Sequence, residues 1–397
     1  MFMSMWGKRN EGDGMKRCSL SMFCLCLACV VVGCGEEVEP TAQPSMDATD
    51  DAVPATKAEA AERKQSGKAD LPFDLCERNG WYEDDECDWF CSDHDPVCHA
   101  EPLGPEPQGE PARYPIILAH GFNAGLEGNW SFYKVEAALV ADGHTVHSAE
   151  VPAFASAATR AEYLAEQVDE LLDRTGGGKV NIIAHSMGGL DSRYLISALG
   201  YGDRVASLTT ISSPHGGSAV ADVALALVPG ESPADVIDGL ATVWSRTFNE
   251  VETDADVRAA LTSLSTAEME DFNAKHLDDG RVYYQSWAGV SSVFGIDNPK
   301  DIEACEGKFL WHEGQSDVMN AQLVPMAAVL APGVSFTPND GMATVEAAKW
   351  GEFQGCIPAD HFDEVGQIRH DSADPHTGFD HLRFYRNLAY GLTERGF

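Results

Sequence analysis

From residue 115 onward, short apolar runs alternate with segments of helical spacing. Residues 115–119 and 180–184 are mostly apolar runs of strand length, and residues 144–151 and 205–212 suggest two further strands. Residues 159–175 carry leucine and valine at intervals of three and four, which predicts an amphipathic helix. Buried strands that alternate with helices form a mostly parallel sheet covered on both faces, so we expect an α/β fold.

Local signals refine this pattern. Thr159 and Glu162 have the spacing of a capping box at the start of the helix, and Gly176 ends it. Residues 281–287 and 334–337 predict two later strands. The second of these runs into an Asn-Asp-Gly turn, which would expose a carboxylate beyond the end of a strand.

The strand pattern lapses between residues 219 and 274. Apolar side chains with helical spacing recur there: Val236, Leu240, Val243, Trp244 and Phe248. Helices inserted after a central strand can form a lid over a site, and ordinary core helices have the same periodicity. Residues 219–274 are therefore predicted to be a helical lid, with core helices as the alternative.

The N-terminal segment has the composition of a signal peptide. A basic stretch at residues 15–17 precedes a short apolar run that is too short to span a membrane. The run ends at Gly33-Cys34, which resembles a bacterial lipobox. We therefore expect residues 1–33 to be removed and Cys34 to be lipidated, which predicts an extracytoplasmic protein that is anchored to a bacterial membrane. An ordinary signal peptide, cut nearby to give a secreted protein, is the alternative.

Composition divides the rest of the chain into four parts. Residues 34–70 are acidic and rich in Ala, Pro and Thr, which predicts a disordered tether. Residues 71–101 form a small cysteine-rich module, and residues 102–112 are a Pro/Gly linker. The α/β domain then occupies residues 113–397.

Six of the eleven cysteines remain after residue 34. Four lie in the small module: Cys76, Cys87, Cys91 and Cys98. The even number in an oxidising compartment predicts disulfides, with a zinc site as the alternative for the module. Cys305 and Cys356 are alone in the C-terminal half, so we expect them to pair.

Acidic residues outnumber basic ones by 63 to 27, which gives a formal charge of −36. Such a surface repels nucleic acid and anionic membranes, so neither is expected as a partner. The charge suits solubility in salty surroundings, and a solvated acidic face is the simpler interpretation.

One apolar run ends in a serine between small residues. Residues 180–184 lead into His185 and Ser186, and a helical segment follows. This is the context of a nucleophile elbow, in which the sharp turn tolerates only small neighbours such as Ala184 and Gly188. The N–H of Met187 could then donate to an oxyanion. A buried strand with a glycine-rich turn is the alternative.

A serine nucleophile needs a histidine base, which in turn needs a carboxylate. Asp340, in the Asn-Asp-Gly turn, suits the acid. Four later histidines are candidates for the base by their order along the chain: His361, His370, His376 and His381.

Six blocks carry a family resemblance. They are residues 120–122 (HGF), 184–189 (AHSMGG), 213–218 (SPHGGS), 284–289 (YQSWAG), 339–342 (NDGM) and 361–365 (HFDEV). In this order they resemble the Gram-negative secreted triacylglycerol lipases of the Pseudomonas and Burkholderia type. The resemblance runs from about residue 114 to the end of the chain. It implies an α/β-hydrolase fold that hydrolyses acylglycerols at a lipid–water interface.

The resemblance also assigns residues. Ser186 corresponds to the nucleophile, Asp340 to the acid and His361 to the base. The N–H groups of Phe122 and Met187 correspond to the oxyanion hole. Some of these relatives depend on a membrane-bound foldase, which the resemblance implies as a partner.

A structural calcium ion near the catalytic histidine is a further implication. The matching carboxylates are Asp317 and Asp363, and main-chain oxygens would come from Gln367 and Asp371. Oxygen ligands of this kind suit calcium. The alternative is that these aspartates are solvated surface charges.

The sequence departs from the family pattern at two positions. Ala184 replaces the first glycine of the elbow, and Glu346 stands near where the family has its second disulfide cysteine. Three functions remain open: a triacylglycerol lipase, a short-chain esterase or phospholipase with the same triad, and a non-catalytic surface binding protein. A binding protein has no need of all three triad residues, so we predict an enzyme.

Overall fold

A computed structural model describes residues 55–57, 59–60, 73–83, 102–122, 131–227, 256–293, 298–310, 316–332, 336–367, 373–374 and 376–397. The predicted signal peptide, Cys34 and the tether up to residue 54 lie outside these residues. So do three cysteines of the small module and the apolar positions between 236 and 248. None of the helices in the described ranges is both long enough and apolar enough to cross a membrane.

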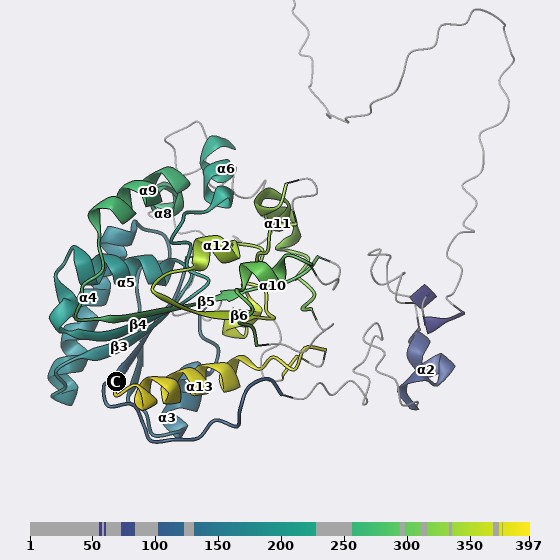
Figure 1. The fold of residues 1–397 in the computed structure, drawn as a ribbon, viewed down its shortest axis with the longest axis horizontal. Coiled ribbons are helices and arrows are strands. Elements are labelled where there is room, and N and C mark those ends of the chain that lie inside the picture. The colour runs from purple at the N-terminus through teal and green to yellow at the C-terminus, as the bar shows by residue number, and fades with distance from the viewer. Residues whose placement is uncertain are drawn as a thin grey trace, which may run out of the picture. The chain divides into compact units, whose positions relative to one another are not determined.

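Six parallel strands form the central sheet in the order β2-β1-β3-β4-β5-β6 (Figure 1). Their bounds are β1 Ile116–Ala119, β2 Val146–Ser148, β3 Val180–His185, β4 Val205–Ile211, β5 Tyr283–Gly289 and β6 Glu352–Ile357. Every residue of β1, β3 and β4 is buried, the polar Asn181, Ser207 and Thr209 included, so these strands show no alternation of buried and exposed positions. The predicted parallel α/β fold is confirmed.

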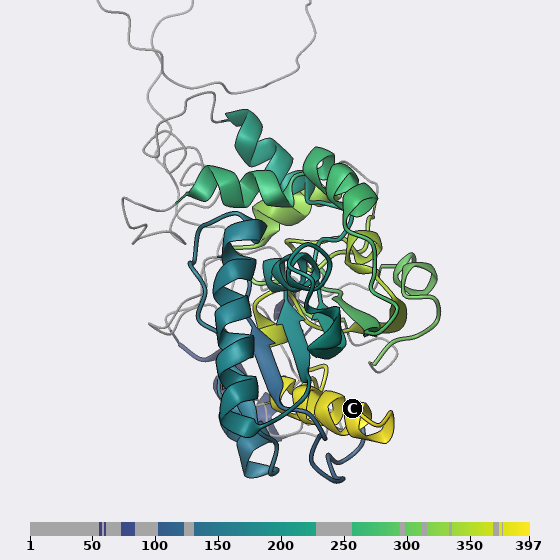
Figure 2. The ribbon, with the colours of Figure 1, turned by 90° about the vertical axis from the view of Figure 1, so that its left-hand side faces the viewer.

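Helices cover both faces of the sheet (Figures 1 and 2). On one face, α3 (Val135–Ala141) and α13 (His381–Glu394) share a buried cluster with Ile116, Leu118 and Ile183. On the other face, α4 (Ala157–Thr175) and α5 (Met187–Ser197) pack on Ile117, Ile182 and Leu208. The alternation of side chains along each strand divides the core into these two layers.

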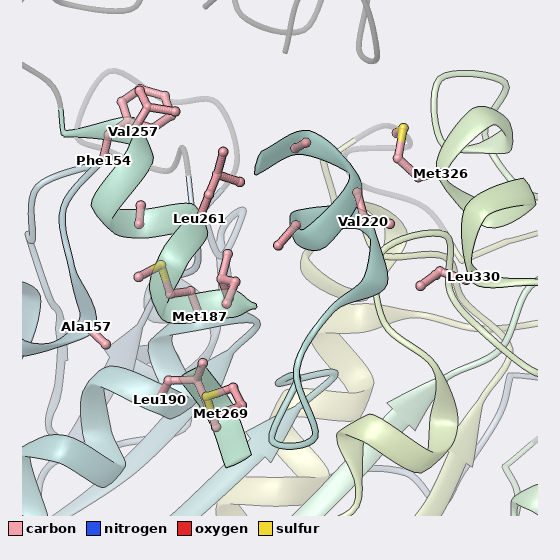
Figure 3. Close-up of a cluster of buried hydrophobic side chains, with 14 of the residues drawn as sticks. Phe154, Ala157, Met187, Leu190, Val220, Val257, Leu261, Met269, Met326 and Leu330 are labelled. Carbon is pink, nitrogen blue, oxygen red and sulfur yellow. The ribbon is translucent and has the colours of Figure 1, made fainter. Parts of the chain in front are cut away.

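A third apolar cluster lies at the carboxyl ends of the strands. It joins α6 (Ala219–Leu227), α8 (Val257–Leu264), α9 (Thr266–Lys275) and α11 (Val324–Leu330) to Met187 and Leu190 of α5 (Figure 3). These helices include the described parts of the predicted lid. We call α6, α8 and α9 the cap.

The remaining elements are short. They are α2 Leu75–Asn79, η1 Trp81–Glu83, η2 Tyr201–Asp203, α10 Asp301–Ala304, α12 Val345–Ala348 and η3 Asp363–Val365.

Two local predictions are wrong. The N-cap of α4 is Ser156, whose hydroxyl accepts the Thr159 N–H at 3.1 Å, so the helix begins earlier than the predicted capping box. No strand includes Phe336 and Thr337, and Phe336 has a φ of 49° that extended backbone does not allow. Among the described residues the last strand is β6, an edge strand in which Gly355 has a φ of 135°.

The predicted disulfide between Cys305 and Cys356 is confirmed and ties α10 to β6. Cys76 is also disulfide-bonded. Its expected partners, Cys87, Cys91 and Cys98, lie outside the described residues.

The predicted linker at residues 102–112 packs on α13. Leu103 is buried, and its N–H donates to the carbonyl oxygen of Gly378 at 3.0 Å. Arg383 donates to the carbonyl oxygen of Gly104, and Asn387 donates to that of Pro105. This segment is therefore fastened to the α/β domain along the last helix.

Candidate active site

Ser186 occupies a strained turn between β3 and α5. Its φ of 55° and ψ of −130° are unusual for a residue with a side chain, and β3 ends immediately before it. Strain of this kind persists only where the surroundings enforce it. The strand–turn–helix geometry is that of a nucleophile elbow.

Close backbone approaches explain the small residues around Ser186. A Cβ on Gly188 would lie 2.2 Å from the carbonyl oxygen of Ala119, and one on Gly189 would lie 2.1 Å from Ser213 Oγ. A Cβ on Gly121 would lie 2.6 Å from Ser186 Cβ. The loop after β1 is therefore pressed against the elbow.

His361 and Asp340 meet in a buried setting beside the elbow. His361 Nδ1 lies 2.8 Å from Asp340 Oδ2. Asp340 Oδ1 accepts the N–H groups of Met342 and Ala343 at 2.8 and 2.7 Å. Burial opposes the charge on Asp340, but His361 and these hydrogen bonds outweigh it and hold the pKa of this carboxyl below its usual value.

Among the other candidate histidines, His370 lies outside the described residues. His381 begins α13, where its Nε2 lies 2.9 Å from the carbonyl oxygen of Tyr133. The structure thus brings His361, and not His381, to the predicted acid.

A second buried carboxyl lies behind the histidine. Glu364 Oε2 is 2.8 Å from His185 Nε2, and its Oε1 accepts the Ser212 hydroxyl at 2.5 Å. Burial and the nearby charge of Asp340 raise the pKa of Glu364 well above its usual value, whereas burial lowers that of His185. Both shifts disfavour the charged forms of this buried pair.

Ser186 and His361 line one mostly apolar pocket. Its apolar walls come from Val220 and Ala221 of α6 and from Leu261 and Leu264 of α8, with Phe122 at its side. An apolar group bound there would lie beside the serine hydroxyl and under the cap.

The residues predicted to supply the oxyanion-hole N–H groups, Met187 and Phe122, both lie next to residues of the elbow in the chain or in space. Met187 is the first residue of α5, so its N–H has no acceptor within the helix. Phe122 follows the glycine that touches Ser186, and its ring packs edge-on against Phe154 at 5.0 Å between centroids. The positive end of the α5 dipole also points at this position.

The two predicted metal carboxylates lie together with a third. Oxygen atoms of Asp317, Asp360 and Asp363 all lie within 4.8 Å of one another. Burial raises the pKa of Asp360, against hydrogen bonds from the N–H groups of Asn320, Phe362 and Asp363. Gln367 is described, and Asp371 lies outside the described residues. A cluster of carboxylate oxygens is the donor set that a hard cation such as calcium prefers.

Sequence reasoning did not single out four residues that surround the site. Asp360 and Glu364 flank His361 closely enough in the chain to have been suspected. Arg160 and Asp191, which form a buried ion pair of 2.7 Å, gave no local signal because they are 31 residues apart.

Comparisons with known proteins identify the family of this chain. Residues 114–309 match the family model of the alpha/beta hydrolase fold. A triacylglycerol lipase from Vibrio cholerae is 34% identical over 210 residues, which cover 48% of this chain and 67% of that protein. The chain belongs to the α/β-hydrolase lipases.

Relatives with lower sequence identity to this lipase include one that aligns with more of its chain. A triacylglycerol lipase from Burkholderia plantarii is 29% identical over 298 residues, which cover 64% of this chain and 80% of that protein. A triacylglycerol lipase from Pseudomonas fragi is also 29% identical, over 198 residues. The predicted enzyme class is confirmed: the chain is a triacylglycerol lipase-like carboxylic-ester hydrolase.

Two solved structures share the fold. The lipase of Staphylococcus hyicus has a TM-score of 0.51 and 18% identity, covering 74% of this chain and 99% of its own. A metagenomic carboxyl esterase has a TM-score of 0.52 and 17% identity, covering 74% and 79%.

Proposed function

We propose that this lipase hydrolyses acylglycerol esters through a triad of Ser186, His361 and Asp340. One observation carries the proposal: the buried 2.8 Å contact between His361 and Asp340 lies at the pocket onto which Ser186 opens. A carboxylate on Nδ1 leaves Nε2 free to accept a proton from the serine hydroxyl.

In the first half of the reaction, Ser186 Oγ attacks the ester carbonyl carbon while His361 Nε2 takes the hydroxyl proton. The carbonyl oxygen becomes an oxyanion that accepts the N–H groups of Phe122 and Met187. The intermediate then collapses. The bond to the leaving alcohol breaks, and the alcohol oxygen takes the proton from His361, which leaves an acyl-serine.

In the second half, His361 takes a proton from water, and the resulting hydroxide attacks the acyl-serine carbonyl. Collapse of the second intermediate releases the fatty acid and returns the proton to Ser186 Oγ. Asp340 stabilises the imidazolium in both halves.

The apolar pocket supports an acyl chain as the group bound beside Ser186. Side chains from α6 and α8 form its roof, so the cap contributes directly to the acyl site. The specific substrate we propose is a triacylglycerol at a lipid–water interface.

A calcium ion suits the cluster of Asp317, Asp360 and Asp363. When bound, it would neutralise three neighbouring carboxylates and fix the loop on which His361 lies. Gln367 and Asp371 complete the proposed ligand set through main-chain oxygens.

The cellular setting is also a proposal. The lipobox at Cys34 supports a lipid-anchored extracytoplasmic enzyme, and the family resemblance supports dependence on a foldase. Mass spectrometry of the native N-terminus tests the first: diacylglycerol on Cys34 is expected, and a soluble product cut elsewhere contradicts it.

Labelling with a fluorophosphonate tests the triad. Wild-type enzyme should carry the label on Ser186. The Ser186→Ala variant should not be labelled, and its kcat should fall by several orders of magnitude. Ser197→Ala, at the other end of α5, is the matched control and should react normally. Labelling that persists in Ser186→Ala overturns the assignment.

A further inference from the structure

One fully buried arginine binds the loop that carries Phe122. Arg160 lies on α4, and its Nη2 donates to the carbonyl oxygens of His120 at 2.8 Å and Gly121 at 3.1 Å. Its Nη1 donates to the carbonyl oxygen of Pro152 at 2.5 Å. Three donations from one rigid guanidinium therefore end on main-chain carbonyl groups, two of them in the loop after β1 that contacts the elbow.

The contact with Gly121 has a consequence for the next residue. The carbonyl group of Gly121 and the N–H of Phe122 belong to one planar peptide unit and point in opposite directions. Holding that oxygen on Arg160 therefore fixes the direction of the Phe122 N–H. His120 Nδ1 lies 3.0 Å from the same oxygen and supplies a second restraint. A cationic donor on the oxygen also polarises the peptide, which strengthens the N–H as a donor.

The same guanidinium is bound to the other half of the proposed oxyanion hole. Arg160 Nε donates to Asp191 Oδ2 at 2.7 Å, and both side chains are buried. Asp191 lies on α5, one turn after Met187. Arg160 thus bridges the loop that supplies one N–H and the helix that supplies the other.

From these contacts we infer that Arg160 is a positioning residue for the oxyanion hole, fixed in place by Asp191. The inference rests on the proposed triad and its two N–H donors. Arg160 acts through the Gly121–Phe122 peptide and touches neither the substrate nor the reacting atoms. The stabilisation that Arg160 provides through the Phe122 N–H should therefore grow as negative charge develops on the ester oxygen.

Arg160→Lys keeps the charge but loses the planar fork that reaches three carbonyl groups. Because loss or misplacement of such a donor costs about 100-fold, we expect kcat on a short p-nitrophenyl ester to fall by about 10- to 100-fold. KM should change little. Arg174→Lys, at the exposed end of the same helix, is the control and should keep wild-type kinetics.

Two inhibitors separate positioning from general support of the fold. A trifluoromethyl ketone with the same acyl chain is attacked by Ser186 Oγ, which leaves an oxyanion on the former carbonyl oxygen and a proton on His361. The corresponding alcohol fills the pocket without reacting. In Arg160→Lys, the inhibition constant of the ketone should rise in proportion to the loss of kcat, while that of the alcohol stays within about threefold of wild type.

Other outcomes overturn the inference. An unchanged kcat in Arg160→Lys would do so. An equal rise in the inhibition constants of the ketone and the alcohol would also do so, because it would show that Arg160 only supports the fold. If Arg160→Lys does not fold, Asp191→Asn carries the same test, because it loosens the guanidinium and should raise the ketone constant selectively. Wild-type enzyme that forms no adduct with the ketone at Ser186 would instead contradict the proposed triad.

Discussion

Two hydrogen bonds join His361 to Asp340. Nδ1 of His361 lies 2.8 Å from Asp340 Oδ2, and the main-chain N–H of His361 donates to the main-chain carbonyl of Asp340 at 3.0 Å. The acid and the base are thus held together through their side chains and through their main chains, although neither residue lies in a strand. Their relative position is therefore fixed before any substrate binds.

The side-chain contact predicts the effect of Asp340→Asn. The amide can present its NH₂ to Nδ1, which forces the proton onto Nε2 and removes the base. We expect kcat to fall by about 10³- to 10⁴-fold with little change in melting temperature, as for other serine triads. Asp173→Asn, on the exposed side of α4, is the control. A loss of less than tenfold would show that Asp340 is not the acid.

Gly289 lies against Glu364. A Cβ at this position would be 1.9 Å from Glu364 Oε1 and 2.6 Å from the carbonyl oxygen of Ala359. Gly289→Ala should therefore lower the free energy of unfolding by about 1–3 kcal/mol, because the surrounding groups are buried and one of them is backbone. Urea denaturation measures this difference. Gly280→Ala, with no neighbour within 4 Å, is the matched control and should be close to wild type.

Burial and the charge of Arg160 lower the pKa of His120 to about 3. A histidine with an ordinary pKa near 6.5 in the unfolded chain binds a proton below that pH, whereas the folded protein does not. Its contribution to stability is therefore lost as the pH falls from about 6.5 toward 3, and the cost at pH 5 is about 2 kcal/mol.

Replacing the titrating group tests this contribution. His120→Asn should lose less stability than wild type between pH 7 and 5, measured by urea denaturation at each pH. Other buried histidines remain in both proteins, so the difference between the two curves isolates His120. Parallel curves would contradict the prediction.

Removal of calcium should destabilise the protein and lower its activity together. Bound only by the folded state, the ion would stabilise it by about 2.7 kcal/mol at a concentration one hundred times its Kd. Calorimetry with calcium and with excess chelator measures the shift in melting temperature. Asp317→Ala and Asp360→Asn should each resemble chelated wild type, and Asp173→Asn should still respond to calcium. A melting temperature that chelation leaves unchanged removes the metal site.

The disulfide between Cys305 and Cys356 spans 51 residues. A crosslink of this separation restricts the unfolded chain, so the double variant Cys305→Ser/Cys356→Ser should be about 2–4 kcal/mol less stable. Its kcat at low temperature should match wild type, because the bond joins α10 to the edge strand β6. Equal stability of the two proteins would show that the crosslink contributes nothing.

The sequence by itself determined the local parts of this lipase. Mostly apolar segments without the alternation of a half-buried strand predicted β1, β3 and β4, since these strands are buried on both faces. Small residues around Ser186 predicted the elbow, because the tight turn there excludes side chains on its neighbours. The even cysteine count outside the module predicted the pair Cys305 and Cys356. Each of these signals is either a pattern of neighbouring residues or the number of cysteines.

Only the tertiary structure decided the contacts between distant segments. Residue order alone left four histidines as candidates for the base; the family resemblance favoured His361, and the fold places it against Asp340. No strand includes the described residues 336 and 337 before Asp340, whose carboxylate is held by its own turn and by His361. Glu364 meets His185 across 179 residues, and Arg160 meets Asp191 across 31. Periodicity records which face of an element is buried, but not which buried polar groups will satisfy one another, because that depends on how the elements pack.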